Sequence, residues 1–209
     1  MQKISLTLTV AAALTISACS IAERSRTLGD PNVSGYTIAQ QVCSTCHGVD
    51  GNSVSPQYPK LAGQNEAYIV QQLNGFKHHL RTDRLAIEIM AGMSRDISTE
   101  QTKEIAEYFA GQNLINEGKG VLLETTKGRD IFQNGIADRG LPACASCHGS
   151  EAKGQFGFPR LAGQHKEYLV KQLHVFKDTH GRPDTPMDLV IKNLSENEIE
   201  HVATYLSLL

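Results

Sequence analysis

Two pentapeptides decide the fold of this chain: Cys43-Ser-Thr-Cys46-His47 and Cys144-Ala-Ser-Cys147-His148. A C-x-x-C-H sequence is the attachment signature of a c-type haem. Its two thiols can bond to the two vinyl-derived carbons of one porphyrin, and the adjacent histidine can then reach the iron as the proximal ligand. The two copies therefore predict two covalently attached haem c groups, held by Cys43, Cys46, Cys144 and Cys147, with His47 and His148 on the irons.

Two other chemistries are open to such cysteines. A single four-cysteine zinc site would take its ligands from two pairs about 100 residues apart, far from the usual short spacing. Redox dithiols, or a strained disulfide within each pair, would leave both adjacent histidines unexplained. The histidine that follows each pair at once favours haem over both alternatives.

The similarity between the two halves extends well beyond the cysteines. Pro59-Lys-Leu-Ala-Gly-Gln64 recurs as Pro159-Arg-Leu-Ala-Gly-Gln164, and Tyr68-Ile-Val-Gln-Gln-Leu73 recurs as Tyr168-Leu-Val-Lys-Gln-Leu173. Such self-similarity, at an offset that drifts only from 101 at the cysteines to 97 near the end of the halves, indicates a tandem duplication. We expect two domains, residues 35–113 and 114–209, each wrapped around one haem, with the join between Gly111 and Gly128.

Hydrophobic spacing predicts an all-α fold. Ile69, Leu73, Phe76 and Leu80 would share one helical face after Gln64. Ser98 to Gln101 and Ser195 to Glu198 match the capping box that opens a helix. Short helices are expected before each cysteine pair, over 38–42 and 130–135. Alternating strand patterns are absent from the sequence.

The second axial ligand of each iron should come from later in each half. Met187 is the only methionine in the second half, and it lies seven residues before Leu194, which precedes Ser195. Met90 lies seven residues before Ile97, which precedes Ser98, whereas Met93 lies four before it. The repeat selects Met90 and Met187, with Met93 as the alternative. The alternative is that these methionines only fill space in the core.

The remaining histidines are weaker ligand candidates because none recurs at an equivalent position in the other half. They are His78, His79, His165, His174, His180 and His201. Histidine and methionine together raise the reduction potential of a haem, which suits a respiratory carrier.

The proline motif predicts a hydrogen bond to each proximal histidine. Pro59 and Pro159 follow their histidines by 12 and 11 residues. A backbone carbonyl there can accept the Nδ1–H of the ring and fix its orientation, although a loop that leads into the next helix is also consistent. The glutamines and tyrosines that follow could reach haem propionates, but packing or capping explains them equally well: Gln64, Gln164, Tyr68 and Tyr168.

The N-terminus predicts export. Residues 1–18 carry one charge, Lys3, and an apolar run too short for a confident membrane span. The run ends at Ile16-Ser-Ala-Cys19, which resembles a bacterial lipobox and indicates lipidation of Cys19. Residues 19–34 are then expected to be a flexible tether. We therefore expect a periplasmic protein attached to a membrane by its lipid. The net charge of −2 argues against nucleic-acid binding.

Together these features resemble the dihaem cytochrome c4 family, within the class I c-type cytochromes. The resemblance covers residues from about 35 to 209 and implies two cytochrome domains with haems near a shared interface. It implies covalent attachment at the four cysteines and ligation by His47 with Met90 and by His148 with Met187. It also implies electron transfer from a quinol-oxidising complex toward a terminal oxidase.

Three features depart from that family pattern. A lipobox is unusual in it, the stretch from 133 to 143 is long, and the loop from 179 to 186 leaves the approach to Met187 open. Two other functions are compatible with the sequence: an electron-transfer subunit of a larger complex, and a dihaem enzyme such as a peroxidase with one displaceable ligand. No catalytic constellation stands out in the sequence.

Overall fold

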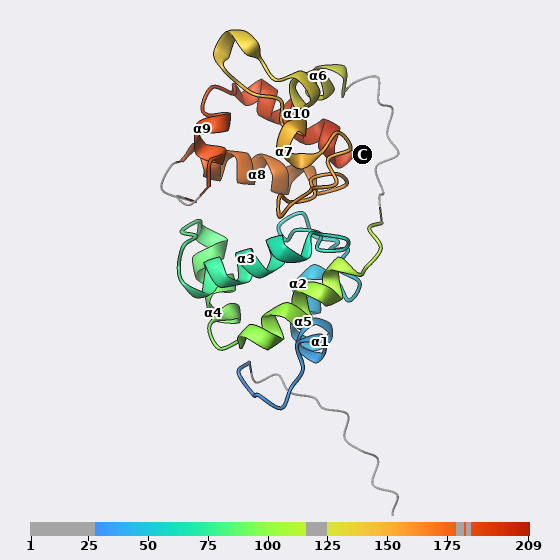
Figure 1. The fold of residues 1–209 in the computed structure, drawn as a ribbon. Helices are drawn as coiled ribbons and strands as arrows, with labels where there is room; N and C mark the ends of the chain where they lie inside the picture. Colours follow the sequence, from blue (N-terminus) through green and yellow to red (C-terminus); the bar gives the residue numbers. More distant parts are fainter. Residues whose placement is uncertain (1–27, 116–124, 179–181, 183–184) are drawn as a thin grey trace, which may run out of the picture.

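The chain folds into two helical domains that stack on one another (Figure 1). The computed structural model describes residues 28–115, 125–178, 182 and 185–209. Within those ranges the only β pairing is an isolated antiparallel bridge between Ile136 and Leu141. The predicted all-α class is confirmed. The signal segment and Cys19 lie outside the described residues.

The elements of the two domains follow similar orders. The first domain contains α1 (Gly35–Ile38), a π-helical turn η1 (Ala39–Cys43), α2 (Ser44–His47), α3 (Glu66–Lys77), a second π-helical turn η2 (Ala86–Met90), α4 (Ala91–Ser94) and α5 (Thr99–Ala110). The second domain contains α6 (Thr126–Asn134), the 3₁₀ turn η4 (Ala137–Arg139), α7 (Ala145–His148), α8 (Lys166–Lys177), α9 (Met187–Ile191) and α10 (Glu196–Ser207).

The last helix of each domain organises that domain. In the first, α5 packs against α1 and α3; in the second, α10 packs against α6 and α8. The first helices approach so closely that only glycine fits. A Cβ on Gly35 would lie 2.3 Å from the carbonyl oxygen of Gln101, and one on Gly128 would lie 2.1 Å from that of His201.

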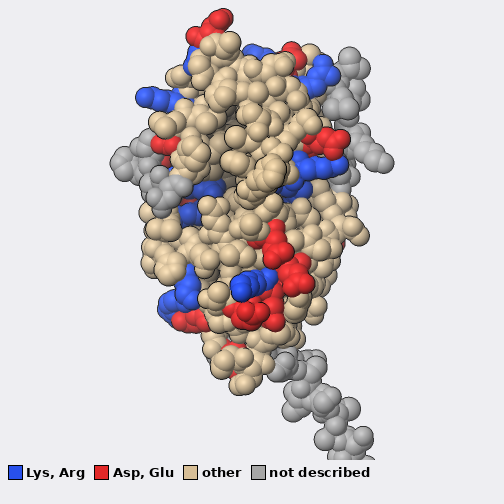
Figure 2. Space-filling view, viewed as in Figure 1, with Lys and Arg blue, Asp and Glu red and all other residues tan. Residues whose placement is uncertain are grey.

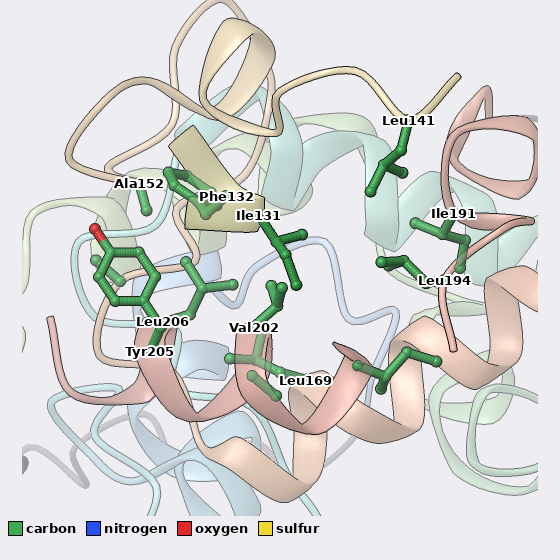
Figure 3. Packing of buried hydrophobic residues seen from close by; sticks show 13 residues of the cluster. Ile131, Phe132, Leu141, Ala152, Leu169, Ile191, Leu194, Val202, Tyr205 and Leu206 are labelled. Carbon is green, nitrogen blue, oxygen red and sulfur yellow. The ribbon is translucent and has the colours of Figure 1, made fainter. Parts of the chain in front are cut away.

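Each domain has its own apolar core. The core of the first domain includes Ile69, Ile105 and Phe109. The second domain buries Phe132 and Ile199 completely, and Figure 3 shows the side chains of α6, α8 and α10 converging on one another. On the predicted helical face, Ile69 and Leu73 belong to the first core, and Phe76 is 8% exposed.

Both predicted capping boxes are present. At the start of α5, the Ser98 hydroxyl accepts from the Gln101 N–H at 3.1 Å, and the Gln101 side chain accepts from the Ser98 N–H at 2.9 Å. At the start of α10, the Glu198 carboxylate accepts from the Ser195 N–H at 2.9 Å. These bonds satisfy amide groups that a helix leaves unpaired at its N-terminus.

Two expectations about the first domain need correction. The α3 helix ends at Lys77, so Leu80 is not on its buried face and is 48% exposed. Residues 28–34, expected to be the end of a tether, belong to the fold: Val33 is 2% exposed in the core. The Gln101 side chain fixes this segment by donating to the carbonyl oxygens of Asp30 and Val33, each at 2.8 Å.

The surface is mixed in charge, with a difference between the domains. Residues 28–115 hold nine Asp and Glu against six Lys and Arg, whereas residues 125–209 hold ten of each. Figure 2 shows acidic side chains gathered over α5 of the first domain. Among the described helices, none is long and apolar enough to cross a membrane.

Candidate functional site

Each C-x-x-C-H sequence ends in a helix of one turn. Cys43 and Cys144 are the residues that precede α2 and α7, and His47 and His148 are their last residues. Cysteines three apart on a helix share a face. The first cysteine of each pair also packs against the core of its own domain. The motif therefore presents two thiols and an imidazole from one anchored turn.

The carbonyl groups of the two prolines hold the two histidines. Nδ1 of His47 lies 2.9 Å from the carbonyl oxygen of Pro59, and Nδ1 of His148 lies 3.0 Å from that of Pro159. Because a carbonyl oxygen can only accept, Nδ1 carries a proton, and in the neutral ring Nε2 then keeps its lone pair. These are the contacts that the sequence spacing predicts.

Burial also prepares both rings to act as neutral ligands. The two histidines are 7% and 6% exposed. Burial lowers the pKa of His47 and that of His148, against the opposing effect of the proline carbonyls. An imidazole that stays unprotonated near neutral pH can donate its Nε2 lone pair to a metal.

The first cysteine of each pair lacks the environment of a reactive thiol, and the two pairs do not form one zinc site. Burial raises the pKa of the Cys43 thiol to about 12 and that of Cys144 to about 11. Reactive cysteines have lowered pKa values. Cys43 and Cys144 pack against different cores, and among the described residues no three Cys, His, Asp or Glu side chains lie close enough to hold one metal ion.

The structure separates the candidate methionines. Met90 ends η2 and packs, partly buried, against the first core; Met187 begins α9 and packs in the same way against the second. Met93 lies in α4 and is not among the side chains packed against the first core. The equivalent placement agrees with the choice that the repeat makes.

Several other histidines have ordinary structural partners. Nε2 of His165 lies 2.8 Å from the carbonyl oxygen of Ser53 in the other domain, and His174 lies 3.3 Å from Glu196. His180 lies outside the described residues.

A pair of crossed glutamines joins the two domains. The side-chain amide of Gln164 accepts from the N–H of Lys60 at 2.8 Å and donates to its carbonyl oxygen at 3.0 Å. Gln64 pairs in the same way with Arg160, at 2.7 and 3.0 Å. Both glutamines are about 5% exposed or less. From the sequence, contact with a haem propionate and packing or capping explain these glutamines equally well. The structure shows that both form hydrogen bonds between the domains.

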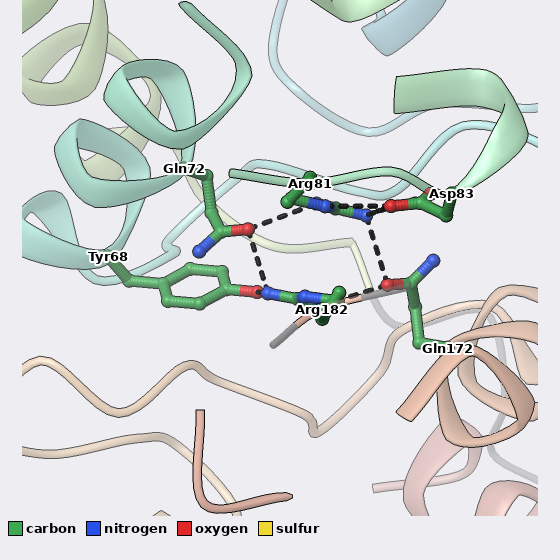
Figure 4. Close-up of polar contacts among 6 residues, drawn as sticks. All are labelled: Tyr68, Gln72, Arg81, Asp83, Gln172 and Arg182. Atoms are coloured by element: carbon green, nitrogen blue, oxygen red, sulfur yellow. Dashed lines mark hydrogen bonds and ion pairs between the residues drawn. The ribbon is translucent and has the colours of Figure 1, made fainter. Parts of the chain in front are cut away.

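A second polar group, which we call the arginine cluster, lies between α3 and α8. Its members are Tyr68, Gln72, Arg81, Asp83, Gln172 and Arg182 (Figure 4). Arg81 forms an ion pair with Asp83 at 2.9 Å and donates to Gln72 and Gln172; Arg182 donates to the same two glutamines, at 2.8 and 3.0 Å. Each guanidinium also stacks on a phenylalanine ring of its own domain.

Sequence reasoning missed the arginine cluster. The signal was available, because Arg81-Thr-Asp83 recurs as Arg182-Pro-Asp184 at the same offset as the cysteines. Both arginines are 8% exposed, which their charge alone would not predict. Asp184 lies outside the described residues.

One buried donor fits a prosthetic group that carries carboxylates. Arg160 is 4% exposed, and its Nε has no hydrogen-bond partner among the described residues. Burial lowers the pKa of this guanidinium to about 10. It follows Pro159 directly, beside the His148 site. A buried cationic donor of this kind is expected to meet an anionic acceptor.

The fold and its two motifs define a two-domain c-type cytochrome. A family model described as cytochrome c matches residues 33–112 and 125–209. Cytochrome c4 of Pseudomonas aeruginosa is 35% identical over 170 residues, which cover 79% of this chain and 82% of the relative. The crystal structure of reduced recombinant cytochrome c4 from Pseudomonas stutzeri has a TM-score of 0.74 and 35% identity, and covers 84% of this chain and 98% of that one.

This chain belongs to the cytochrome c4 family. Its two domains, each with a C-x-x-C-H site, imply two haem c groups, and the protein is a dihaem electron carrier rather than an enzyme. Another relative, from Thiomonas intermedia, is named thiosulfate dehydrogenase electron acceptor; it is 31% identical over 173 residues, which cover 79% of this chain and 77% of the relative.

Proposed function

We propose that both domains hold their haem covalently and with a complete pair of protein ligands. Cys43 and Cys46 attach the first haem, and Cys144 and Cys147 attach the second. Two further pairs ligate the irons: His47 with Met90, and His148 with Met187. The observation that carries this assignment is the matched set in both domains: a buried histidine held by a proline carbonyl, and a methionine on the edge of the core.

Each haem, when bound, supplies an iron that takes up and releases one electron. The protein residues keep that exchange free of other chemistry. The proline carbonyls fix the ring orientation of each histidine, so that its Nε2 is held in one orientation for binding the iron. The thioether sulfur of methionine favours the reduced metal, which gives a carrier a high potential. Two filled axial positions leave no site for a substrate.

The test is carbon monoxide binding to the reduced protein. Two complete ligand sets predict slow and minor binding at both irons, because a ligand must first leave. Rapid binding of one equivalent would show an open iron and would remove the proposed ligand from that domain. Substitution Met187→Ala is the positive control, since it should open the second iron alone.

We further propose that the carrier works in the periplasm, anchored by a lipid on Cys19, between a quinol-oxidising complex and a terminal oxidase. The apolar run before Cys19 supports export and lipidation. Substitution Cys19→Ser should move the protein from the membrane fraction to the soluble fraction. Unchanged fractionation would remove the anchor from the proposal.

A second partner class has one specific observation in its favour. The Thiomonas relative is named as an electron acceptor of a dehydrogenase. A dedicated subunit of such a complex would use the same haem sites. Purification in mild detergent separates the two possibilities: a shuttle is recovered alone, whereas a subunit is recovered with its dehydrogenase.

A further inference from the structure

The hydrogen bond from His47 to Pro59 continues through the peptide group into the second domain. The carbonyl group of Pro59 and the N–H of Lys60 belong to the same peptide unit. The carbonyl accepts from Nδ1 of His47 at 2.9 Å, and the N–H donates to Oε1 of Gln164 at 2.8 Å. One planar peptide group therefore links a predicted iron ligand of the first domain to a side chain of the second.

The second domain has the same arrangement, with the roles of the two domains exchanged. The carbonyl of Pro159 accepts from Nδ1 of His148 at 3.0 Å, and the N–H of Arg160, in the same peptide unit, donates to Oε1 of Gln64 at 2.7 Å. Each histidine is thus connected to a glutamine of the opposite domain. The links cross, because Gln64 lies in the first domain and Gln164 in the second.

Hydrogen bonds in such a chain reinforce one another. When the peptide N–H donates to a good acceptor, electron density moves toward the carbonyl oxygen of the same unit, which then accepts more strongly. The stronger acceptor draws the Nδ1 proton and makes the imidazole a more basic ligand. A more basic ligand stabilises the oxidised metal and lowers its reduction potential.

We infer that Gln164 tunes the first domain's haem through His47, and that Gln64 tunes the second domain's haem through His148. Both glutamines act as positioning residues across the interface, so docking of the domains sets the basicity of both histidines. The inference rests on the proposed ligation by these histidines. It adds that the potential of each haem depends on a side chain of the other domain.

Burial keeps water from replacing the glutamines. Gln64 is 5% exposed and Gln164 is 4% exposed, while Lys60 and Arg160 are 5% and 4% exposed. A backbone N–H that lost its glutamine would not find solvent easily, and the peptide unit would lose its polarising partner. The side-chain oxygen of Gln64 also accepts from the N–H of Asn65, and that of Gln164 accepts from the N–H of His165. These bonds hold each side-chain amide in place.

The test uses the matched variants Gln164→Leu and Gln64→Leu in the full-length haem protein. In the reduced, diamagnetic state, ¹H–¹⁵N spectra report the Hδ1 signal of each ligand histidine. Gln164→Leu should move the Hδ1 signal of His47 upfield and raise the potential of the first domain's haem, with smaller changes at His148. Gln64→Leu should give the converse pattern.

The crossed pattern distinguishes this route from a local effect. Gln64 and Gln164 lie in the same loops as the prolines, so a purely local disturbance would change the histidine of the substituted domain. That result, or equal changes at both histidines, would overturn the inference. The control His165→Leu removes the side-chain contact to Ser53 across the same interface but keeps the backbone N–H that donates to Gln164, so it should leave both Hδ1 signals in place.

A rescue variant covers the case in which leucine separates the domains. Gln164→Glu keeps an acceptor oxygen for the N–H of Lys60 but loses the donor to the Lys60 carbonyl oxygen, which keeps the Arg160 guanidinium as its donor at 3.0 Å. This variant should hold the His47 Hδ1 signal at its wild-type position or downfield of it. An upfield shift in this variant would also overturn the inference. If the unsubstituted protein lacked signals of two iron-bound histidines, the proposed ligation itself would fail, which is a separate outcome.

Discussion

Arg182 of the second domain donates a hydrogen bond to the Gln72 side chain of the first, at 2.8 Å, although the two residues are 110 positions apart in the sequence. Arg81 reciprocates by donating to Gln172 at 3.2 Å. The two domains are therefore joined by reciprocal contacts from equivalent positions, and they should unfold as one cooperative unit.

Replacement of one arginine should weaken that cooperativity. Arg182→Met removes hydrogen bonds to Gln72, Gln172 and Tyr68, of which Gln72 and Gln172 keep Arg81 as a donor. We expect a loss of about 1–3 kcal/mol, the usual cost of removing a buried hydrogen-bonded group. Calorimetry should show a lower Tm and a broadened or split transition.

The matched control for this variant is on the surface. Within the described part of the chain, Arg95 pairs only with its neighbour Asp96, and it is largely exposed, so Arg95→Met should change Tm little. Equal effects of the two substitutions would show that the arginine cluster does not hold the domains together.

Substitution Cys46→Ala should remove one of the two bonds to the first haem. The remaining Cys43 can form only a single thioether, so we expect reduced incorporation and an altered α-band for one haem. Mass spectrometry of the denatured protein gives the covalent haem content. Cys147→Ala should have the corresponding effect on the second domain only, and full haem incorporation with an unchanged α-band in either variant would contradict the attachment scheme.

Substitution Met90→His should lower the potential of the first domain's haem, because a thioether ligand favours the reduced iron more than imidazole does. Redox titration followed by visible absorption measures the change. The comparison variant is Met93→Leu, which should leave both potentials unchanged. If Met93→Leu shifted a potential and Met90→His did not, the ligand of the first domain would be Met93.

The two capping boxes should respond differently to acid. Hydrogen bonds from Arg139, and then those from Ser195, lower the pKa of Glu198 to about 2. A depressed pKa means that the ionised carboxylate stabilises the fold above its unfolded pKa, near 4.3, and that this contribution is lost as the pH falls toward 2. The first domain has the neutral Gln101 at the equivalent position.

Glu198→Gln should therefore reduce stability at pH 7 by about 1 kcal/mol, the usual value of a capping interaction, and flatten the pH dependence between about pH 4.5 and 2. Chemical denaturation at several pH values measures both effects. A variant that kept the wild-type slope across this range would assign the acid sensitivity to other carboxylates.

The sequence predicted those features that depend on short-range pattern. The C-x-x-C-H turns, the capping boxes at Ser98 and Ser195, and the proline contacts to the histidines follow from spacing along one segment. The repeat then separated Met90 from Met93, because two copies of one register carry more information than one. A single copy would have left the choice open.

The features that the sequence did not predict are those that need two distant segments. Nothing near Arg81 or Arg182 in the chain says that they share acceptors, since their partners lie 91 and 110 residues away. Val33 is another case: its place in the core depends on the Gln101 side chain, 68 residues later. The polar sequence around it predicts a tether equally well.

The most direct test of the account is the covalent haem content of the mature protein, made in a host with a working haem-attachment system. The account predicts a polypeptide that carries the added mass of two haems after denaturation, with one haem on each of the two tryptic fragments that contain a cysteine pair. A colourless protein with four free thiols, or a single haem per chain, would contradict it.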